Sequence, residues 1–355
     1  MFDLHSDFKT FYEDHVRLGR KRRNDLADFR NANLDRLESG LDALGEKDGT
    51  EYAYFKEARD QGGYVMRTLN QHPNNEHDID VGLIFEAKDL PDDPAEARQL
   101  VCDAFKEKPG NFRRPPKART NAVTVWYADG PHVDFAIYRR RKGSEGEKII
   151  EHAGGDEWTE RDPDAVTKWF DERVEALSPD PELYAWVTAE AGQLRRIVRF
   201  VKFFCRSRAD WDLPGGMMTT ALVVECYRSD ATRDDVALYE TMAALQRRLA
   251  GWTTVLNPVD PSQDLTEKSE YLDQVESLRD KLVWALDKLA VLHDPNCTEA
   301  QARNAWRLVF NHAFWNAKAA TATAKAESLL RPAAAASGFA FPNRPTGPVK
   351  PAGFA

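Results

Sequence analysis

The spacing of hydrophobic and polar residues changes twice along the chain. Residues 6–44 are rich in helix formers and repeat leucine and phenylalanine at helical spacing, which predicts two helices, the second of them long. Between residues 51 and 141 the pattern becomes short β-prone runs separated by Gly, Pro and Asn, with one helical stretch at 94–106. The runs predict strands at 52–55, 79–85, 122–126 and 133–138. We therefore expect a mixed sheet that carries one or two helices.

After about residue 163 the pattern is helical almost throughout. Prolines and glycines divide it into helices expected at 163–176, 181–208, 217–228, 233–250, 266–292 and 298–329. Residues 331–355 contain five prolines and three glycines with little apolar periodicity, so we expect a flexible tail. The predicted fold class is α+β, with a sheet lobe and N-terminal helices over 1–160, a helical lobe over 161–330 and a tail over 331–355.

Composition and charge indicate which classes of binding partner the chain can have. The 355 residues include 42% hydrophobic residues, which excludes a disordered chain, and 49 basic against 58 acidic residues give a net charge of −9. An acidic chain is a poor general binder of nucleic acid, although a local basic groove could hold a small anion. The chain shows no membrane-spanning run, no secretory leader and four widely spaced cysteines, so we expect a cytoplasmic protein with reduced core thiols.

The strongest chemical signal is Asp78-Ile79-Asp80 at the start of a predicted strand. Side chains two residues apart share one face of a strand, so the two carboxylates would repel each other. A divalent cation with oxygen ligands, such as Mg²⁺, would neutralise both. The alternative for such a pair is a solvated strand edge.

Two further features strengthen the metal hypothesis. Asp134 lies inside a run that otherwise predicts a buried strand, where a carboxylate is unfavourable unless it is paired, protonated or bound to metal. Gly62 and Gly63 follow a β-prone run, an arrangement in which backbone N–H groups can hold phosphate, although such a pair is commonly only a turn. If the two aspartate strands are neighbours, the three carboxylates suit two-metal transfer of a nucleotidyl group. We expect His77 and His132 to face away from Asp78 and Asp134, either as packing residues or as residues that support the metal ligands.

The predicted helix over residues 194–208 has a basic stripe. Arg195, Arg199, Lys202 and Arg206 fall on one face, opposite a row of apolar residues. The stripe is either a binding surface for an anion or an ordinary solvated face.

Taken together, these motifs resemble the DNA polymerase β type of nucleotidyltransferase, and within it the bacterial cGAS-like enzymes called CD-NTases. The tract from Gln61 to Thr68 resembles the family's loop, residues 78–82 resemble its Asp-Ile-Asp strand, and its third metal ligand falls on Asp134. The resemblance implies a bilobed fold with a nucleotide between the lobes. The chain departs from the family at Gly63 and Gly216, where a serine is usual.

The resemblance also implies the chemistry. Asp78, Asp80 and Asp134 would be catalytic and would bind two Mg²⁺ ions, with Mn²⁺ as an alternative. The nucleotide-binding residues would be Gln61, Gly62, Gly63, Arg199, Lys202 and Gly216, with Lys202 on the triphosphate. The substrates would be ATP and GTP or other NTPs. The product would be a cyclic di- or trinucleotide for antiphage signalling (CBASS), with a cyclic GMP-AMP as our first expectation.

The tail resembles the C-termini of CD-NTases whose operons encode an E1/E2-like conjugating enzyme. The resemblance rests on residues 337–345 and 353–355, and it implies conjugation through Ala355. A plain disordered tail is the alternative. Two other functions stay open: a nucleotidyltransferase that modifies a macromolecule, and a nucleotide-binding module without turnover that is conjugated through its tail. We expect neither a membrane nor an obligate nucleic acid as partner.

Overall fold

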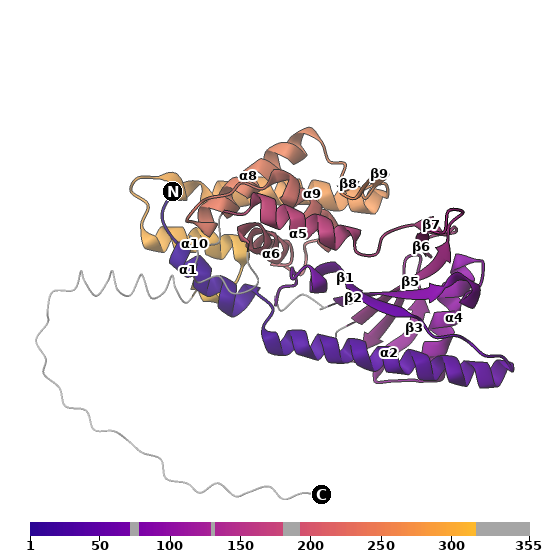
Figure 1. The fold of residues 1–355 in the computed structure, drawn as a ribbon. Helices are drawn as coiled ribbons and strands as arrows, with labels where there is room; N and C mark the ends of the chain where they lie inside the picture. Colours follow the sequence, from indigo (N-terminus) through magenta and orange to yellow (C-terminus); the bar gives the residue numbers. More distant parts are fainter. Residues whose placement is uncertain (72–77, 129–131, 180–191, 317–355) are drawn as a thin grey trace, which may run out of the picture.

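The computed structural model describes residues 1–71, 78–128, 132–179 and 192–316. These residues form two regions, each with its own hydrophobic core (Figure 1). We call the described residues of 20–160 the sheet region, and those of 1–16 and 165–316 the helical region. The tail, with Ala355, lies outside the described residues, so conjugation there stays a prediction.

One sheet of seven strands organises the sheet region as described. The strands are β1 Glu57–Gln61, β2 Asp78–Glu86, β3 Phe112–Ala118, β4 Val123–Tyr127, β5 His132–Lys142, β6 Lys148–His152 and β7 Thr159–Glu160. Their order is β1-β2-β5-β4-β3, and β6 pairs with β5 and β7. β2 and β5 run parallel, whereas the other pairs are antiparallel. The predicted strands at 79–85, 122–126 and 133–138 are confirmed as β2, β4 and β5.

Other strand predictions were wrong or missing. Residues 52–55 form no strand, and the chain enters the sheet only at Glu57, through the largely polar β1 at one edge. The sequence pattern also missed β3, which contains Pro115 and Pro116. β3 tolerates them because it is the other edge of the sheet and has register shifts against β4.

Two helices cover one face of the sheet. They are α2 Arg20–Asp48 and α4 Pro94–Glu107, and both confirm the sequence prediction. α4 begins where the Asp93 carboxylate accepts hydrogen bonds from the backbone N–H groups of Ala95 and Glu96, at 2.6 and 3.0 Å. Leu37 and Leu41 of α2 pack into the same core as Phe105 of α4 and the strands. The opposite face of the sheet is thus left for the helical region.

The helical region contains most of the remaining elements. Its helices are α1 His5–Phe11, η1 Tyr12–Val16, α5 Ala165–Leu177, α6 Gln193–Cys205, α7 Gly216–Cys226, α8 Asp234–Gly251, α9 Ser269–Leu289, η4 Ala290–His293 and α10 Glu299–Phe310. A hairpin of β8 Leu256–Asn257 and β9 Asp260–Asp264 was not predicted. The helix expected over 298–329 ends at Phe310, because Asn311 adopts a left-handed backbone conformation (φ 49°). Residues 181–191 of the helix expected at 181–208 lie outside the described residues.

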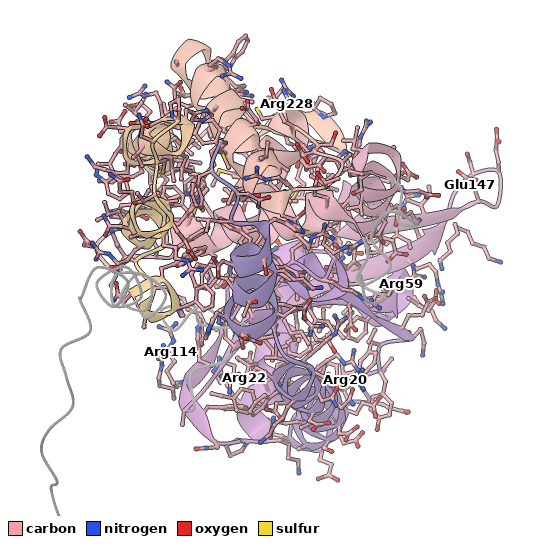
Figure 2. The ribbon with its side chains drawn as sticks, turned by 90° about the vertical axis from the view of Figure 1, so that its left-hand side faces the viewer. Arg20, Arg22, Arg59, Arg114, Glu147 and Arg228 are labelled. Atoms are coloured by element: carbon pink, nitrogen blue, oxygen red, sulfur yellow. The ribbon has the colours of Figure 1, made fainter. Side chains whose placement is uncertain are left out.

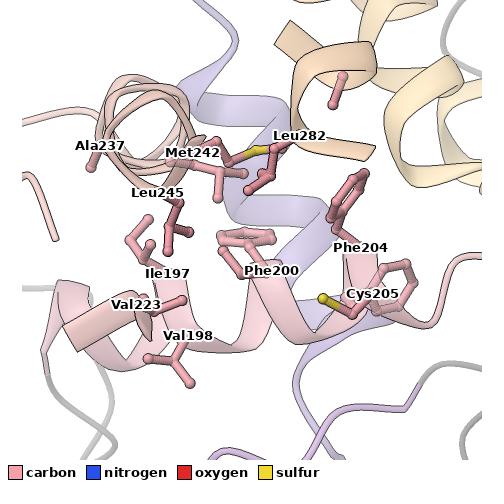
Figure 3. Close-up of a cluster of buried hydrophobic side chains, with 14 of the residues drawn as sticks. Ile197, Val198, Phe200, Phe204, Cys205, Val223, Ala237, Met242, Leu245 and Leu282 are labelled. Carbon is pink, nitrogen blue, oxygen red and sulfur yellow. The ribbon is translucent and has the colours of Figure 1, made fainter. Parts of the chain in front are cut away.

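α6 is the central helix of this region (Figure 1). Every residue of α6 except Lys202 is buried. Figure 3 shows Ile197, Phe200 and Phe204 of α6 gathered with Leu245 of α8 and Leu282 of α9. The basic stripe is therefore not a solvated face.

α1 packs in the core of the helical region, although it precedes the sheet in the chain (Figure 1). The Phe8 ring lies 5.2 Å from that of Phe200 and 4.7 Å from that of Trp306. The boundary at residue 160 stays a prediction, but the first helix packs with the helices that follow it. No helix in the described part of the chain is long and apolar enough to cross a membrane.

Candidate active site

Strand register places four polar side chains in a row across the sheet. Gln61 of β1 pairs with Asp80 of β2, Asp80 pairs with Asp134 of β5, and Asp134 pairs with Thr124 of β4. Directly paired residues point to the same face of a sheet. Asp78 shares that face, because it lies two residues before Asp80. The structure thus brings together the three aspartates that the sequence singled out.

The three carboxylates are electrostatically unfavourable to one another. The pKa of Asp80 is raised well above its usual range, first by burial and then by the negative charges of Asp78 and Asp134. Burial also raises the pKa of Asp134, although a hydrogen bond from the Thr124 hydroxyl opposes that shift. A positively charged partner would relieve this repulsion.

His132 does not face away from the site as expected. Its Nε2 lies 3.6 Å from Oδ2 of Asp134, and His132 pairs with Asp78 across β2 and β5. The expectation misapplied the alternation of strand side chains, because residues two apart share a face. His77 lies outside the described residues.

Gly62 allows the chain to pass close to the carboxylates. It follows β1 and opens the single-turn helix α3 Gly62–Val65 with a left-handed backbone (φ 62°). A Cβ at this position would lie 1.8 Å from Oδ2 of Asp80. Only glycine combines this left-handed backbone with the lack of a side chain. The backbone at residue 62 therefore lies directly against the Asp80 carboxylate.

Lys202 faces the carboxylates from the helical region. Its Nζ donates a hydrogen bond to Oγ1 of Thr68 at 2.9 Å. Burial lowers the pKa of Lys202 to about 8, and the negative charges of Asp78 and Asp80 oppose that shift. Thr68 ends the loop tract that begins at Gln61, but no sequence signal marked it as the partner of Lys202, which is 134 positions away.

The two glycines that replace serines differ in their surroundings. A Cβ on Gly216, the first residue of α7, would lie 3.5 Å from Nζ of Lys202, which is an ordinary contact. A Cβ on Gly63 would lie 2.8 Å from Cδ2 of Leu69, which is too close unless Leu69 moves. The structure therefore has room for a serine at 216 and little at 63.

A cleft of about 550 Å³ joins these groups between the two regions. Its lining includes, from the predicted set, Gln61, Gly62, Gly63, Asp78, Asp80, Asp134, Lys202 and Gly216. It also includes residues that sequence reasoning did not select, among them Thr68, Asn121, Tyr138, His152 and Arg161. The signal for these was weak, because they come from separate segments that only the fold brings together.

Arg199 is the predicted site residue that does not line the cleft. It is buried, and its guanidinium donates a hydrogen bond to the hydroxyl of Tyr12 in η1. Helical spacing placed it on the face of Lys202, but the N-terminal segment covers it. Its positive charge adds to the effect of burial in lowering the pKa of Lys202, so Arg199 affects the cleft from outside its lining, and its predicted contact with the nucleotide stays a prediction.

The side chains of the described residues are not arranged as a complete metal-binding site. Among the described residues, no group of three or more His, Cys, Asp or Glu side chains is arranged to hold a metal ion. Asp78, Asp80 and Asp134 provide only carboxylate oxygens, the donor type that Mg²⁺ and Mn²⁺ prefer. Their mutual repulsion fits a cation-binding role, and metal binding stays a prediction.

Comparison with known families supports this picture. Residues 56–138, which contain the glycine pair and all three aspartates, match the model described as "Cyclic GMP-AMP synthase DncV-like, nucleotidyltransferase domain". The chain carries a DncV-like nucleotidyltransferase domain. The resemblance to bacterial cGAS-like nucleotidyltransferases that the sequence motifs suggested is thereby confirmed, and so is the enzyme class.

Solved structures share the fold beyond this domain. Vibrio cholerae DncV in its GTP-bound form is 16% identical, with a TM-score of 0.66, over 86% of this chain and 94% of that one. Escherichia coli MS115-1 CdnC with ATP is 17% identical, with a TM-score of 0.59, over 87% and 98%. Bradyrhizobium diazoefficiens CdnG with GTP is 17% identical, with a TM-score of 0.61, over 87% and 95%. The predicted α+β fold of the polymerase β type is confirmed.

Proposed function

We propose that this nucleotidyltransferase joins NTPs into a cyclic di- or trinucleotide that serves as a signal in antiphage defence. The observation that carries the proposal is the row of carboxylates on β2 and β5, which faces Lys202 across the cleft. The cleft offers negative groups for metal-assisted chemistry on one side and a cation for phosphate on the other. ATP and GTP are the proposed substrates, because DncV has been solved with GTP and CdnC with ATP.

The helical side of the cleft would hold the triphosphate of the donor nucleotide. Lys202 supplies the positive charge, and Thr68 fixes the direction of its ammonium group. The backbone of Gly62 and Gly63 approaches from the sheet side, where a side chain at 62 would collide with Asp80. This arrangement would place the α-phosphate of the donor near the carboxylates.

Asp78, Asp80 and Asp134 would hold two Mg²⁺ ions. When bound, the ions would lower the pKa of the attacking ribose hydroxyl and stabilise the leaving pyrophosphate. Asp134 would take up the proton of that hydroxyl, and the hydrogen bond from Thr124 would hold its carboxylate in place. A bond forms from the hydroxyl oxygen to the α-phosphorus, and the bond to pyrophosphate breaks. A second transfer, from a hydroxyl of the linear product to its own triphosphate, would close the ring.

The first expectation for the product is a cyclic dinucleotide of the GMP-AMP type. The family description matched by residues 56–138 names such a synthase, which supports this choice. Conjugation of the C-terminus would be a separate property of the tail.

The test is a product assay with the purified full chain. The protein is incubated with all four radiolabelled NTPs and Mg²⁺, treated with phosphatase, and the products are resolved by chromatography and mass spectrometry. We expect a phosphatase-resistant cyclic species from the wild type and none from Asp78→Ala. Equal product from Asp78→Ala would contradict the assignment of the site. A linear product or a labelled macromolecule instead would contradict the cyclase proposal and favour the other transferases.

A further inference from the structure

The cleft has a second end, beyond the carboxylates, that the triphosphate contacts do not use. Its floor follows β5, where Asp134, Ala136 and Tyr138 alternate onto one face and line the cleft. Ala122, beside β4, also lines it. The two alanines leave space between the catalytic carboxylates and the aromatic side chain of Tyr138. The cleft therefore extends along β5 from the carboxylates toward Tyr138.

Arg161 lies over this end of the cleft. Its segment is fixed on two sides, because its backbone N–H donates to the carbonyl of Ile150 at 2.9 Å and Gln61 Nε2 donates to the carbonyl of Pro163 at 2.8 Å. The side chain is half-buried and lines the cleft. In the part of the chain that the structure describes, no carboxylate forms an ion pair with its guanidinium.

The neighbouring acid is already engaged. Asp162 forms an ion pair with Lys168 at 2.9 Å and accepts a hydrogen bond from the backbone N–H of Asp164 at 2.9 Å. The charge of Arg161 reaches into the cleft instead, where it opposes the rise that burial causes in the pKa of Tyr138 and adds to the fall that burial causes in the pKa of His152. Arg161 is therefore a cation positioned toward a ligand.

The other polar groups at this end also favour a ligand that accepts hydrogen bonds. The Tyr138 hydroxyl accepts from Gln61 Nε2 at 3.1 Å, which leaves its proton for another acceptor. Burial lowers the pKa of His152 to about 4, so its ring is neutral at pH 7 and its Nε2 donates to the carbonyl of Asn121 at 3.0 Å. Arg161 and Tyr138, the latter only 2% exposed, thus both line this part of the cleft.

We propose that Arg161 selects guanine in this subsite by donating to O6 and N7 of the base. Guanine presents two adjacent acceptors along that edge, which an arginine can bind with two parallel hydrogen bonds, whereas adenine presents one acceptor and the N6 amino donor. This inference rests on the proposed function and deepens it. It names Arg161 as a specificity residue that contacts the base and takes no part in the transfer itself.

An arginine in a nucleotide cleft could instead bind phosphate, and that role predicts a different result. A phosphate contact is the same for every NTP, whereas a base contact depends on O6 and N7. Arg206, at the end of α6 on the Lys202 side of the cleft, provides the matched contrast. Arg22, exposed on α2 and labelled in Figure 2, is the control outside the cleft.

The experiment measures the dissociation constants of α,β-methylene analogues of GTP and ATP, which bind but cannot donate a nucleotidyl group. Titrations with Mg²⁺ use the wild type, Arg161→Gln, Arg206→Gln and Arg22→Gln. We expect Arg161→Gln to weaken the GTP analogue by about 10- to 100-fold and the ATP analogue by less than about twofold. Arg206→Gln should weaken both equally, and Arg22→Gln neither.

Equal weakening of both analogues by Arg161→Gln, or no weakening of either, would overturn the guanine assignment and leave the proposed function standing. Failure of both analogues to bind the wild type would overturn the proposed function and the assignment together. Unfolding temperatures of the variants separate a lost contact from a damaged fold. A selective loss for guanine at an unchanged unfolding temperature has no structural explanation apart from base recognition.

Discussion

Charged residues are arranged in opposite ways in the two regions. In the helical region a buried pair joins opposite charges: Arg196 forms two hydrogen bonds with Asp234, at 2.6 and 2.9 Å, and both side chains are almost completely buried. In the sheet region Asp78, Asp80 and Asp134 share one face, and burial together with their like charges raises the pKa of Asp80. The paired charges stabilise the fold, whereas the clustered carboxylates oppose it. Groups that destabilise a fold and line a cleft are the expected signature of a functional site.

The largest expected effect comes from the cluster. Asp80→Asn removes a metal ligand and should lower product formation by at least about 10³-fold, which corresponds to about 4 kcal/mol in the activation barrier. The substitution also removes like-charge repulsion, so the unfolding temperature should not fall. The control is Asp60→Asn. Asp60 lies on β1, the strand that pairs with β2, and its carboxylate forms an ion pair with Arg30 of α2. The assay compares product formation and thermal unfolding of the two variants. An active Asp80→Asn variant would contradict the account of the site.

The paired charges should show the reverse behaviour. Asp234→Ala leaves Arg196 buried without its carboxylate and should lower the free energy of unfolding by about 3–5 kcal/mol. Asp171→Ala removes the acidic partner of Arg195, but Asp171 is 54% exposed, so the expected loss is about 0–1 kcal/mol. Denaturant unfolding of the two variants measures the difference. Equal losses in the free energy of unfolding would mean that the buried Arg196–Asp234 pair stabilises the fold no more than the exposed Arg195–Asp171 pair.

Lys202 lies on α6 of the helical region, and its side chain lines the cleft, where we propose that it binds phosphate. Lys202→Met should lower kcat/KM for NTPs by about 10- to 100-fold, because one charge-assisted contact to phosphate is worth about 1.5–3 kcal/mol. Its loss should leave the unfolding temperature unchanged or raise it, because a half-buried cation is replaced by an apolar side chain of similar size. Steady-state kinetics and thermal unfolding test both statements. A large fall in the unfolding temperature at constant KM would assign Lys202 a purely structural role.

The smallest effects concern the two glycines. Gly216→Ser fits beside Lys202 and adds one hydroxyl, so KM for NTPs should change by less than about fivefold, with stability unchanged. Gly63→Ser forces Leu69 to move and should destabilise the protein by about 1 kcal/mol or more. Kinetics and denaturant unfolding of the pair check the contrast. Equal stability of the two variants would show that Leu69 yields without strain.

The sequence predicted the parts of the site that depend on local patterns. Alternation along β2 and β5 placed Asp78, Asp80 and Asp134 on strands, and the spacing of the motifs suggested a metal-binding role for them, which stays a prediction. Helical spacing also placed Lys202 correctly. These are short-range signals, and they persist in the fold because each is set within one element.

Other parts depend on contacts between distant segments, which a single sequence does not show. Helical spacing placed Arg199 with Lys202, but Tyr12, 187 positions away, covers it. β3 was missed because its prolines are acceptable only on an edge strand, and edge position is a property of the whole sheet. Arg161 gave no signal at all, because its position over Tyr138 depends on how β6 and the segment before α5 pack.

The most direct test of the account is the effect of Mg²⁺ on the thermal unfolding of the full chain. The account predicts that Mg²⁺ raises the unfolding temperature of the wild type, because a ligand that binds only the folded state stabilises it. It also predicts that Asp80→Asn, without Mg²⁺, unfolds at or above the temperature of the metal-free wild type and responds little to the ion. An equal response of both proteins to Mg²⁺, together with a lower unfolding temperature of Asp80→Asn, would contradict the claim that the carboxylate cluster exists to bind metal.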